Sequence, residues 1–148
     1  MIRKTNLLAL IALLAFAFTA APFVRAAEEK KKGTDSPLGK EMEELGKTIK
    51  ALRKSVKDPA KNADSLKLAE TAEKAAIASK DLKPAMLEKA PEADRAKLLD
   101  GYKKAMDEVI ATLGTLKKQI KDSKNEDAVE TLKKLKDLEE AGHEKYNP

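Results

Sequence analysis

Two long apolar stripes, each built on alternating steps of three and four residues, constrain the fold of this chain more than any other feature. The stripes consist of Leu38, Met42, Leu45, Ile49, Leu52 and Val56, and of Leu99, Tyr102, Met106, Val109, Leu113, Leu116 and Ile120. Such steps place side chains on one face of an α-helix. No segment alternates with the period of two that is typical of a strand. The sequence therefore predicts an all-α protein.

Proline-containing segments divide the chain into successive helices. Ser36 followed by Pro37 predicts the cap and the first residue of the first helix, and the pair Asp58–Pro59 ends that helix. An alanine-rich second helix follows, and the two prolines of residues 81–91 break it. The third helix is expected to begin near Glu92.

A fourth helix completes the domain. Ser123 and Glu126 predict a capping box at its start, and its apolar residues continue to Tyr146. Four amphipathic helices joined by short connections pack as an antiparallel up-down-up-down four-helix bundle. One such domain is expected over residues 37–148.

The N-terminal residues have the pattern of an export signal. Two basic residues precede the uncharged apolar run of residues 7–21, which is too short to span a bilayer. Residues 1–26 are therefore expected to be a secretory signal peptide that is cleaved after Ala26, with a retained N-terminal anchor as the alternative. Residues 27–36 are expected to be a disordered lead-in. In a Gram-negative cell, this signal predicts a periplasmic protein without a membrane segment after cleavage.

Charge and composition exclude several classes of function. Three of the 30 basic residues and none of the 25 acidic residues lie in 1–26, so the rest of the chain has a net charge of only +2. This balance argues against nucleic-acid binding. The chain has no cysteine, which excludes disulfides, thiolate metal sites and covalent haem attachment. A single histidine and no inward cluster of carboxylates leave little acid–base machinery, so an enzyme is not expected.

The single histidine and one methionine are expected to converge. His143 lies eleven residues, or about 20° of helical rotation, from Leu132, which predicts that the imidazole points inward. Met42 belongs to the apolar stripe of the first helix. In an up-down-up-down bundle, the start of the first helix and the end of the last lie at the same end, on axes about 8–10 Å apart. The thioether and the imidazole can therefore face each other.

Glycines gather at the same end of the predicted bundle. Gly39, Gly46, Gly101 and Gly142 all fall within predicted helices, where each costs about 0.5–1 kcal/mol relative to alanine. Missing side chains beside a methionine and a histidine would leave a slot for a flat ligand. Each feature also has an ordinary structural explanation: a gap-filling methionine, a histidine hydrogen-bonded to a nearby carboxylate, or glycines that permit close helix approach.

Two segments resemble a known family. The segments "SPLGKEMEELGKTIKAL" (36–52) and "DAVETLKKLKDLEEAGHEKY" (127–146) are similar to the first and last helices of the cytochrome b562 family. Members of this family are exported four-helix bundles that bind haem b non-covalently. The resemblance implies an electron-transfer protein whose iron is held by Met42 and His143, and which serves a periplasmic redox partner of unknown identity.

The resemblance also implies further contacts with the cofactor. Leu98 and Tyr102 correspond to aromatic positions that face the porphyrin in the family, and Gly46 lies one turn beyond the methionine ligand. The family has arginine one turn before and one turn after the ligand histidine, whereas this chain has Glu139 and Asn147. Glu139 could orient the imidazole, lie at the haem edge, or join the methionine and histidine as a ligand of a metal without porphyrin.

Two haem-free functions therefore stay open beside the cytochrome. The first is a periplasmic copper-binding or metal-handling bundle, since a soft thioether with an imidazole suits copper. The second is a chaperone-like bundle, which would present an exposed apolar stripe to its partners.

Overall fold

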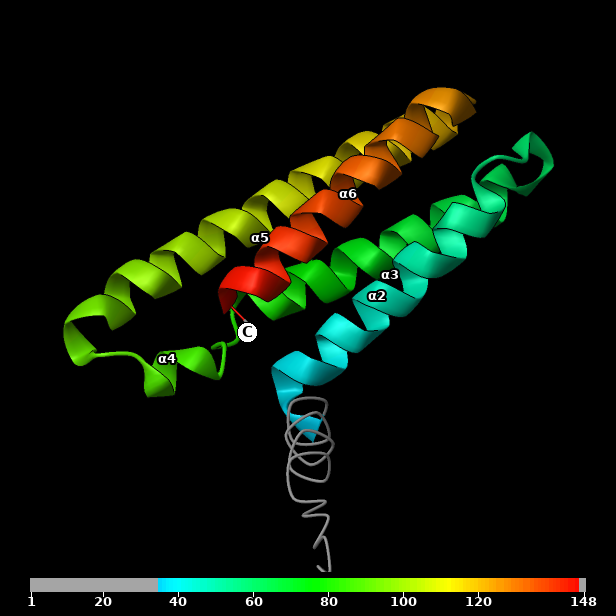
Figure 1. The fold of residues 1–148 in the computed structure, drawn as a ribbon. Helices are drawn as coiled ribbons and strands as arrows, with labels where there is room; N and C mark the ends of the chain where they lie inside the picture. The colour runs from blue at the N-terminus through cyan, green and yellow to red at the C-terminus, as the bar shows by residue number, and fades with distance from the viewer. Residues whose placement is uncertain (1–34, 147–148) are drawn as a thin grey trace, which may run out of the picture.

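The computed structural model describes residues 35–146, and this part of the chain is helical without strands (Figure 1). The all-α prediction is therefore confirmed. The expected signal peptide, its cleavage after Ala26 and nearly all of the lead-in over residues 27–36 lie outside the described residues. The elements are α2 (Pro37–Ser55), η1 (Pro59–Lys61), α3 (Asn62–Lys80), α4 (Met86–Lys89), α5 (Glu92–Lys121) and α6 (Asn125–Tyr146).

The first long helix begins where local chemistry predicts it. The Ser36 hydroxyl accepts a hydrogen bond from the backbone N–H of Gly39 at 2.9 Å, and Pro37 occupies the first turn. A serine cap satisfies one of the free N–H groups at a helix start, and proline costs nothing there because its missing N–H has no partner to lose. Asp58 similarly caps the short η1 turn through the N–H of Ala60 at 3.0 Å.

The connection between α5 and α6 corrects one expectation. Ser123 does not cap α6, because its backbone has a left-handed φ of 56° and ends α5. The N–H of Lys124 donates to the carbonyl of Gln119 at 2.8 Å, which is the long bond of a left-handed helix end. Asn125 begins α6 instead, and its amide donates to the carbonyl of Val56 at 2.6 Å. The end of α2 is thereby fastened to the start of α6, at what is here named the closed end.

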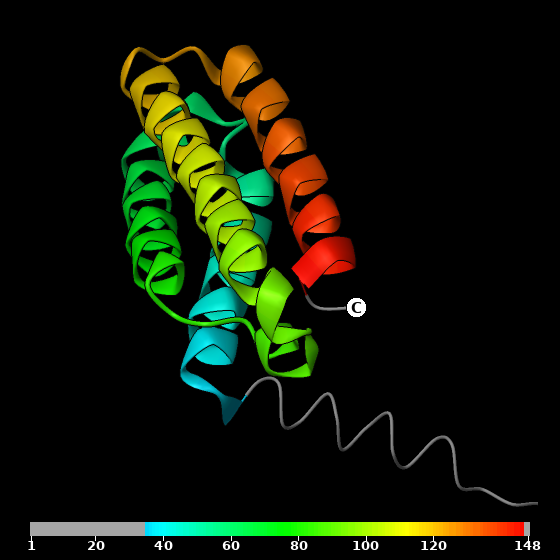
Figure 2. The same ribbon diagram turned by 90° about the vertical axis from the view of Figure 1, so that its left-hand side faces the viewer.

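The four long helices form a bundle with one open side. α2 packs along α3, α3 along α5, and α5 along α6, whereas α2 and α6 make few contacts. Figures 1 and 2 show α2 and α3 as one pair and α5 and α6 as another, with the chain reversing direction between successive long helices. The boundary between α2 and α6, here named the seam, is the one sparsely packed boundary between neighbouring long helices.

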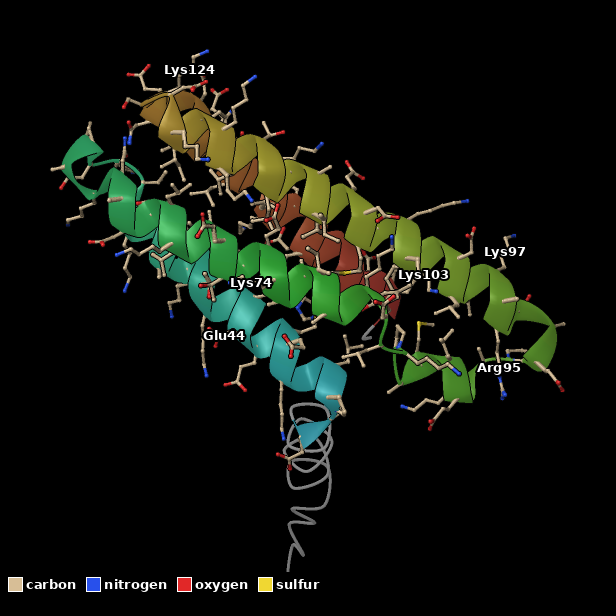
Figure 3. The ribbon with its side chains drawn as sticks, turned by 180° about the vertical axis from the view of Figure 1, so that it is seen from behind. Glu44, Lys74, Arg95, Lys97, Lys103 and Lys124 are labelled. Atoms are coloured by element: carbon tan, nitrogen blue, oxygen red, sulfur yellow. The ribbon has the colours of Figure 1, made fainter. Side chains whose placement is uncertain are left out.

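Burial follows the predicted stripes. The core is densest toward the closed end, and its fully buried members include Leu52, Val56, Leu113, Leu116, Ile120 and Leu135. Buried alanines on α3 allow its neighbours to approach closely, while charged side chains such as Lys74 and Lys97 project from the outer faces of α3 and α5 (Figure 3). None of the described helices is long and apolar enough to cross a membrane.

Candidate functional site

A contact between Gly46 and Glu139 sets the alignment of α2 and α6 across the seam. A Cβ atom added to Gly46 would lie 3.8 Å from Oε1 of Glu139. The other carboxylate oxygen, Oε2, lies 3.7 Å from Nη2 of Arg53 on α2. The missing side chain at position 46 thus leaves room for the carboxylate, and an arginine from the facing helix balances its charge.

This alignment places Met42 and His143 at equivalent positions. Asn125 lies beside Val56 at the closed end, and Glu139 lies beside Gly46 farther along the seam. The two helices therefore run in opposite directions here. Met42 is four residues before Gly46, and His143 is four residues after Glu139, so each lies one turn farther toward the end opposite the closed end, here named the mouth.

The two candidate ligands differ in burial. Met42 is half-buried and packs against the hydrophobic core. His143 is exposed, so the expectation that its imidazole points into the core is wrong. The helical angle places His143 close to the buried Leu132 on the helix surface, but a face is buried only where a neighbouring helix covers it. α2 makes few contacts with α6, and this face of α6 is left exposed at His143.

The imidazole of His143 is available to a ligand. Among residues 35–146 it has no hydrogen-bond or ion-pair partner. Glu139 does not orient the imidazole, because its carboxylate pairs with Arg53. In the same part of the chain, no group of three or more histidine, cysteine, aspartate or glutamate side chains is arranged to hold a metal ion. The ion pair of Glu139 across the seam differs from all three roles that the sequence suggested, which were to orient the imidazole, to lie at the haem edge and to bind a metal.

A pair of tyrosines fills the mouth on the α5 side. Tyr102 is 4% exposed, and its hydroxyl donates to the backbone carbonyl of Ser79 at 2.7 Å. Its ring meets that of Tyr146 edge to face, with centroids 5.5 Å apart. Burial raises the pKa of Tyr102 to about 12. The hydroxyl of Ser79 is buried and has no hydrogen-bond partner. The mouth therefore contains one fixed aromatic ring and one unsatisfied hydroxyl.

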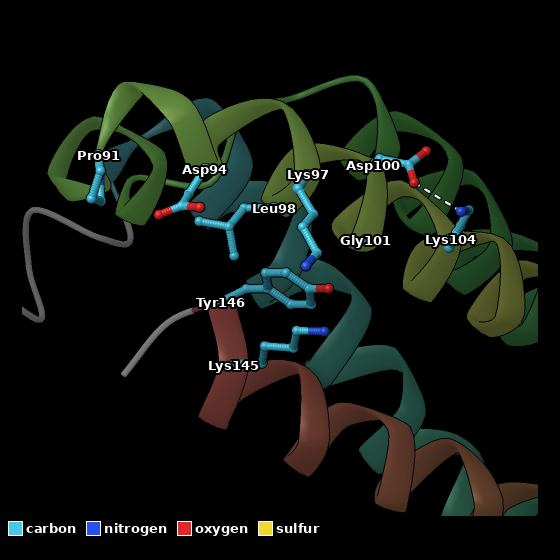
Figure 4. Close-up of a pocket in the computed structure, with 9 residues that line it drawn as sticks. All are labelled: Pro91, Asp94, Lys97, Leu98, Asp100, Gly101, Lys104, Lys145 and Tyr146. Carbon is cyan, nitrogen blue, oxygen red and sulfur yellow. Dashed lines mark ion pairs between the residues drawn. The ribbon is translucent and has the colours of Figure 1, made fainter.

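The glycines at the mouth do not form one continuous slot. A Cβ atom on Gly101 would lie 3.0 Å from the Tyr146 hydroxyl, so this tyrosine already uses the space that the glycine leaves. Gly142 has no neighbour within 4 Å of such an atom. Leu98 is half-buried and lines an open depression of about 470 Å³ together with Gly101 and Tyr146 (Figure 4). The glycines thus have different surroundings: Tyr146 fills the space at Gly101, the Glu139 carboxylate faces Gly46, and only open space lies beside Gly142.

The sequence alone did not identify three further residues of this site, which are Arg53, Ser79 and Tyr146. The burial of Tyr146 could have been predicted from its spacing, because it extends the buried stripe of α6 that passes through Leu132 and Leu135. No sequence pattern indicates the roles of Arg53 and Ser79, since these depend on which residue of a neighbouring helix lies opposite.

Comparison with known proteins decides the family. A family model described as cytochrome b562 matches residues 37–147, a range that spans all four long helices and includes Met42 and His143. The chain belongs to the cytochrome b562 family. No curated protein and no solved structure matches it. Membership of the cytochrome b562 family implies a helical, haem-binding protein of electron transfer.

The residues at the mouth suit a haem group chemically. Haem iron accepts an imidazole nitrogen and a thioether sulfur as axial ligands. This chain presents one of each at matching heights of a sparsely packed seam, and the imidazole has no competing partner. A chain without cysteine can retain the group only by coordination and by burial of its apolar faces.

Proposed function

We propose that this chain is a periplasmic electron-transfer protein that binds one haem b non-covalently, with Met42 and His143 as the axial ligands of the iron. The observation that carries the proposal is the Gly46–Glu139 contact. It fixes the alignment of α2 and α6, so that one turn toward the mouth from each partner leads to a sulfur on one side and an imidazole on the other. Periplasmic export depends on the signal predicted for residues 1–26.

The haem would supply a one-electron couple, and the chain would determine its potential and its exposure. His143 would hold the iron through a ring nitrogen, and Met42 would hold it through a soft thioether, a donor that favours the ferrous state and raises the potential. Two axial side chains leave no open position for a substrate, which is why an electron carrier fits better than an enzyme. Holding both donors on separate helices limits geometric change between the two oxidation states.

Neighbouring residues would position the group. Leu98 and Tyr102 offer an apolar edge and a fixed ring on α5, and the bond from Tyr102 to Ser79 restricts rotation of that ring. Gly46 admits the carboxylate of Glu139 between the helices, and Arg53 neutralises it. Glu139 would thereby add little net negative charge beside the propionates. This pairing explains how the chain tolerates glutamate where the family has arginine.

No observation favours the haem-free alternatives. Glu139 is engaged by Arg53 and so is not free to complete a copper site with Met42 and His143. A chaperone-like surface would expose an apolar stripe, whereas Ile77 is the one large hydrophobic side chain that is exposed within residues 35–146.

Optical spectra of matched variants test the proposal. The purified exported protein should be red, with the sharp visible bands of low-spin haem on reduction. Met42→Leu and His143→Ala should each lose the low-spin spectrum, while Met86→Leu, a methionine on α4, should keep it. Unchanged spectra in both ligand variants would exclude the proposed ligation, and a protein that takes up no haem would exclude the function.

A further inference from the structure

A second concavity lies on the seam, toward the closed end. Its floor consists of three aliphatic residues, and its rim consists of four basic ones. Val56, Val129 and Leu132 form the floor, and Arg53, Lys57, Lys133 and Lys136 form the rim. No acidic residue lines this concavity, which is here named the cationic groove.

The positive charge of the cationic groove is only partly balanced. Lys57 and Lys133 are exposed and have no ion-pair partner in the described part of the chain. Arg53 reaches Glu139 at 3.7 Å, yet its Nη2 atom is buried without a hydrogen bond. Lys136 pairs with Glu140, one turn farther along α6, at 2.6 Å. Two exposed lysines without an ion-pair partner and two partly balanced cations thus surround a small apolar floor.

The electrostatic environment of Lys136 is consistent with this crowding. Its hydrogen bond to Glu140 and the charge of that carboxylate raise the pKa of Lys136, whereas the charge of Arg53 opposes the increase. The hydrogen bond and charge of Lys136, and then the charge of Arg53, lower the pKa of Glu140, so this carboxylate balances part of the positive charge at that edge of the groove. Lys57 and Lys133 remain the exposed cations of the rim that could meet a partner's carboxylates.

The depression at the mouth differs in this respect. Lys97, Lys104 and Lys145 line it, but so do Asp94 and Asp100, and the Lys104–Asp100 pair is 2.8 Å apart (Figure 4). Its charges are interleaved, which gives no preference for an anion. The unbalanced charge therefore distinguishes the cationic groove from the depression at the mouth.

The size of the cationic groove distinguishes between kinds of ligand. Its volume is about 250 Å³, which is below the range of about 300–1,000 Å³ that is usual for small-molecule sites. A space of this size suits one anchoring side chain of a protein partner, since binding energy at interfaces concentrates in such anchors. The rim charges would act on the partner's approach and orientation.

We propose that the cationic groove docks an acidic protein partner, which inserts an aliphatic side chain against Val56, Val129 and Leu132 and sets carboxylates against Lys57 and Lys133. That this partner exchanges electrons with the chain rests on the proposed function. His143 lies seven residues beyond Lys136 on the same helix, about 10 Å along its axis. A partner in the groove would therefore lie close to a haem held at the mouth.

A peptide titration of the full isotope-labelled protein tests the docking. The probe is a capped pentapeptide with one leucine flanked by two glutamates on each side, and the control peptide has serine in place of leucine. Backbone amide shifts should concentrate at the groove, between residues 53–57 and 129–136, and the serine peptide should bind more weakly. Binding of the leucine peptide that is diffuse over the surface, or that equals that of the serine peptide, would overturn the proposal.

Charge reversal supplies the matched control. Lys57→Glu with Lys133→Glu should weaken the leucine peptide about tenfold, as expected when two exposed ion pairs are replaced by repulsions. Lys67→Glu with Lys118→Glu changes net charge equally at exposed lysines outside the groove and should leave affinity nearly unchanged. Equal weakening by both double variants would overturn the docking. Failure of this test in a protein with normal haem spectra would overturn the docking alone, whereas groove binding by a protein that takes up no haem would overturn the proposed function alone.

Discussion

Replacing Tyr102 with phenylalanine should make the protein less stable than wild type near neutral pH and more stable than wild type in strong alkali. At neutral pH the variant loses the hydrogen bond from the tyrosine hydroxyl to the carbonyl of Ser79. That carbonyl also accepts from the N–H of Leu82 at 3.1 Å, so it is not left unsatisfied. The loss should therefore cost about 1 kcal/mol, which is typical of a single neutral hydrogen bond.

Alkali reverses the order because Tyr102 must stay protonated in its buried position. Its pKa is about 12 in the folded protein, against an ordinary value of 10.0 for an exposed tyrosine. Between these values the unfolded chain binds fewer protons than the folded one, so the free energy of unfolding falls as the pH rises. The loss attributable to Tyr102 should reach about 1.4 kcal/mol at pH 11 and about 2 kcal/mol at pH 12. Phenylalanine does not titrate, so the two stability curves should cross at about pH 11.

Urea unfolding, followed by far-ultraviolet circular dichroism at a series of pH values, measures both curves. Lysines titrate in the same range, but their contribution is common to the two proteins and cancels in the difference. Tyr146→Phe in the otherwise unchanged chain leaves Tyr102 as the single tyrosine, so near-ultraviolet tyrosinate absorbance reads its ionisation directly. Parallel stability curves from neutral pH to about pH 12 would refute the argument that Tyr102 is desolvated in the fold.

Three further substitutions test the packing of the bundle, each by urea unfolding. Gly114→Ala should raise the free energy of unfolding by about 0.5–1 kcal/mol, because alanine favours the helix more than glycine does and the added methyl meets no atom within 4 Å. A decrease would show that neighbouring atoms occupy this space beside α5. Asn125→Ala should lower it by about 1–2 kcal/mol, since the bond to Val56 joins two helices; no loss would show that the closed end is not fastened there. Glu139→Gln should lower the free energy of unfolding by less than about 1 kcal/mol, because the ion pair with Arg53 is partly exposed. The difference from wild type should shrink in high salt. A large loss that does not depend on salt would contradict an exposed ion pair at this position.

Features that depend on local chemistry could be predicted from the sequence. Ser36 and Pro37 mark the start of α2 because a hydroxyl cap and a missing N–H act within a single turn. Ser123 shows the limit of this reasoning. Its sequence context allows either a helix cap or a left-handed helix end, and the bonds at the end of α5 select the latter.

Features that depend on the alignment between helices could not be predicted. The helical angle placed His143 near the face of α6 that meets α2, but it could not tell where α2 stops covering that face. The pairing of Glu139 with Arg53 also depends on which turns of two distant helices stand opposite. Family resemblance supplied the two candidate ligands, and the structure supplied the alignment that places them at the same height of the seam.

The most direct test of the central claim is the methyl resonance of Met42 in the reduced, haem-loaded protein. With methyl-labelled methionine, a methyl bound through its sulfur to low-spin ferrous haem lies above the porphyrin and is shifted far upfield by the ring current. The account predicts one such resonance, which disappears in Met42→Leu and persists in Met86→Leu. A loaded protein whose methionine methyls all resonate in the ordinary range would contradict it.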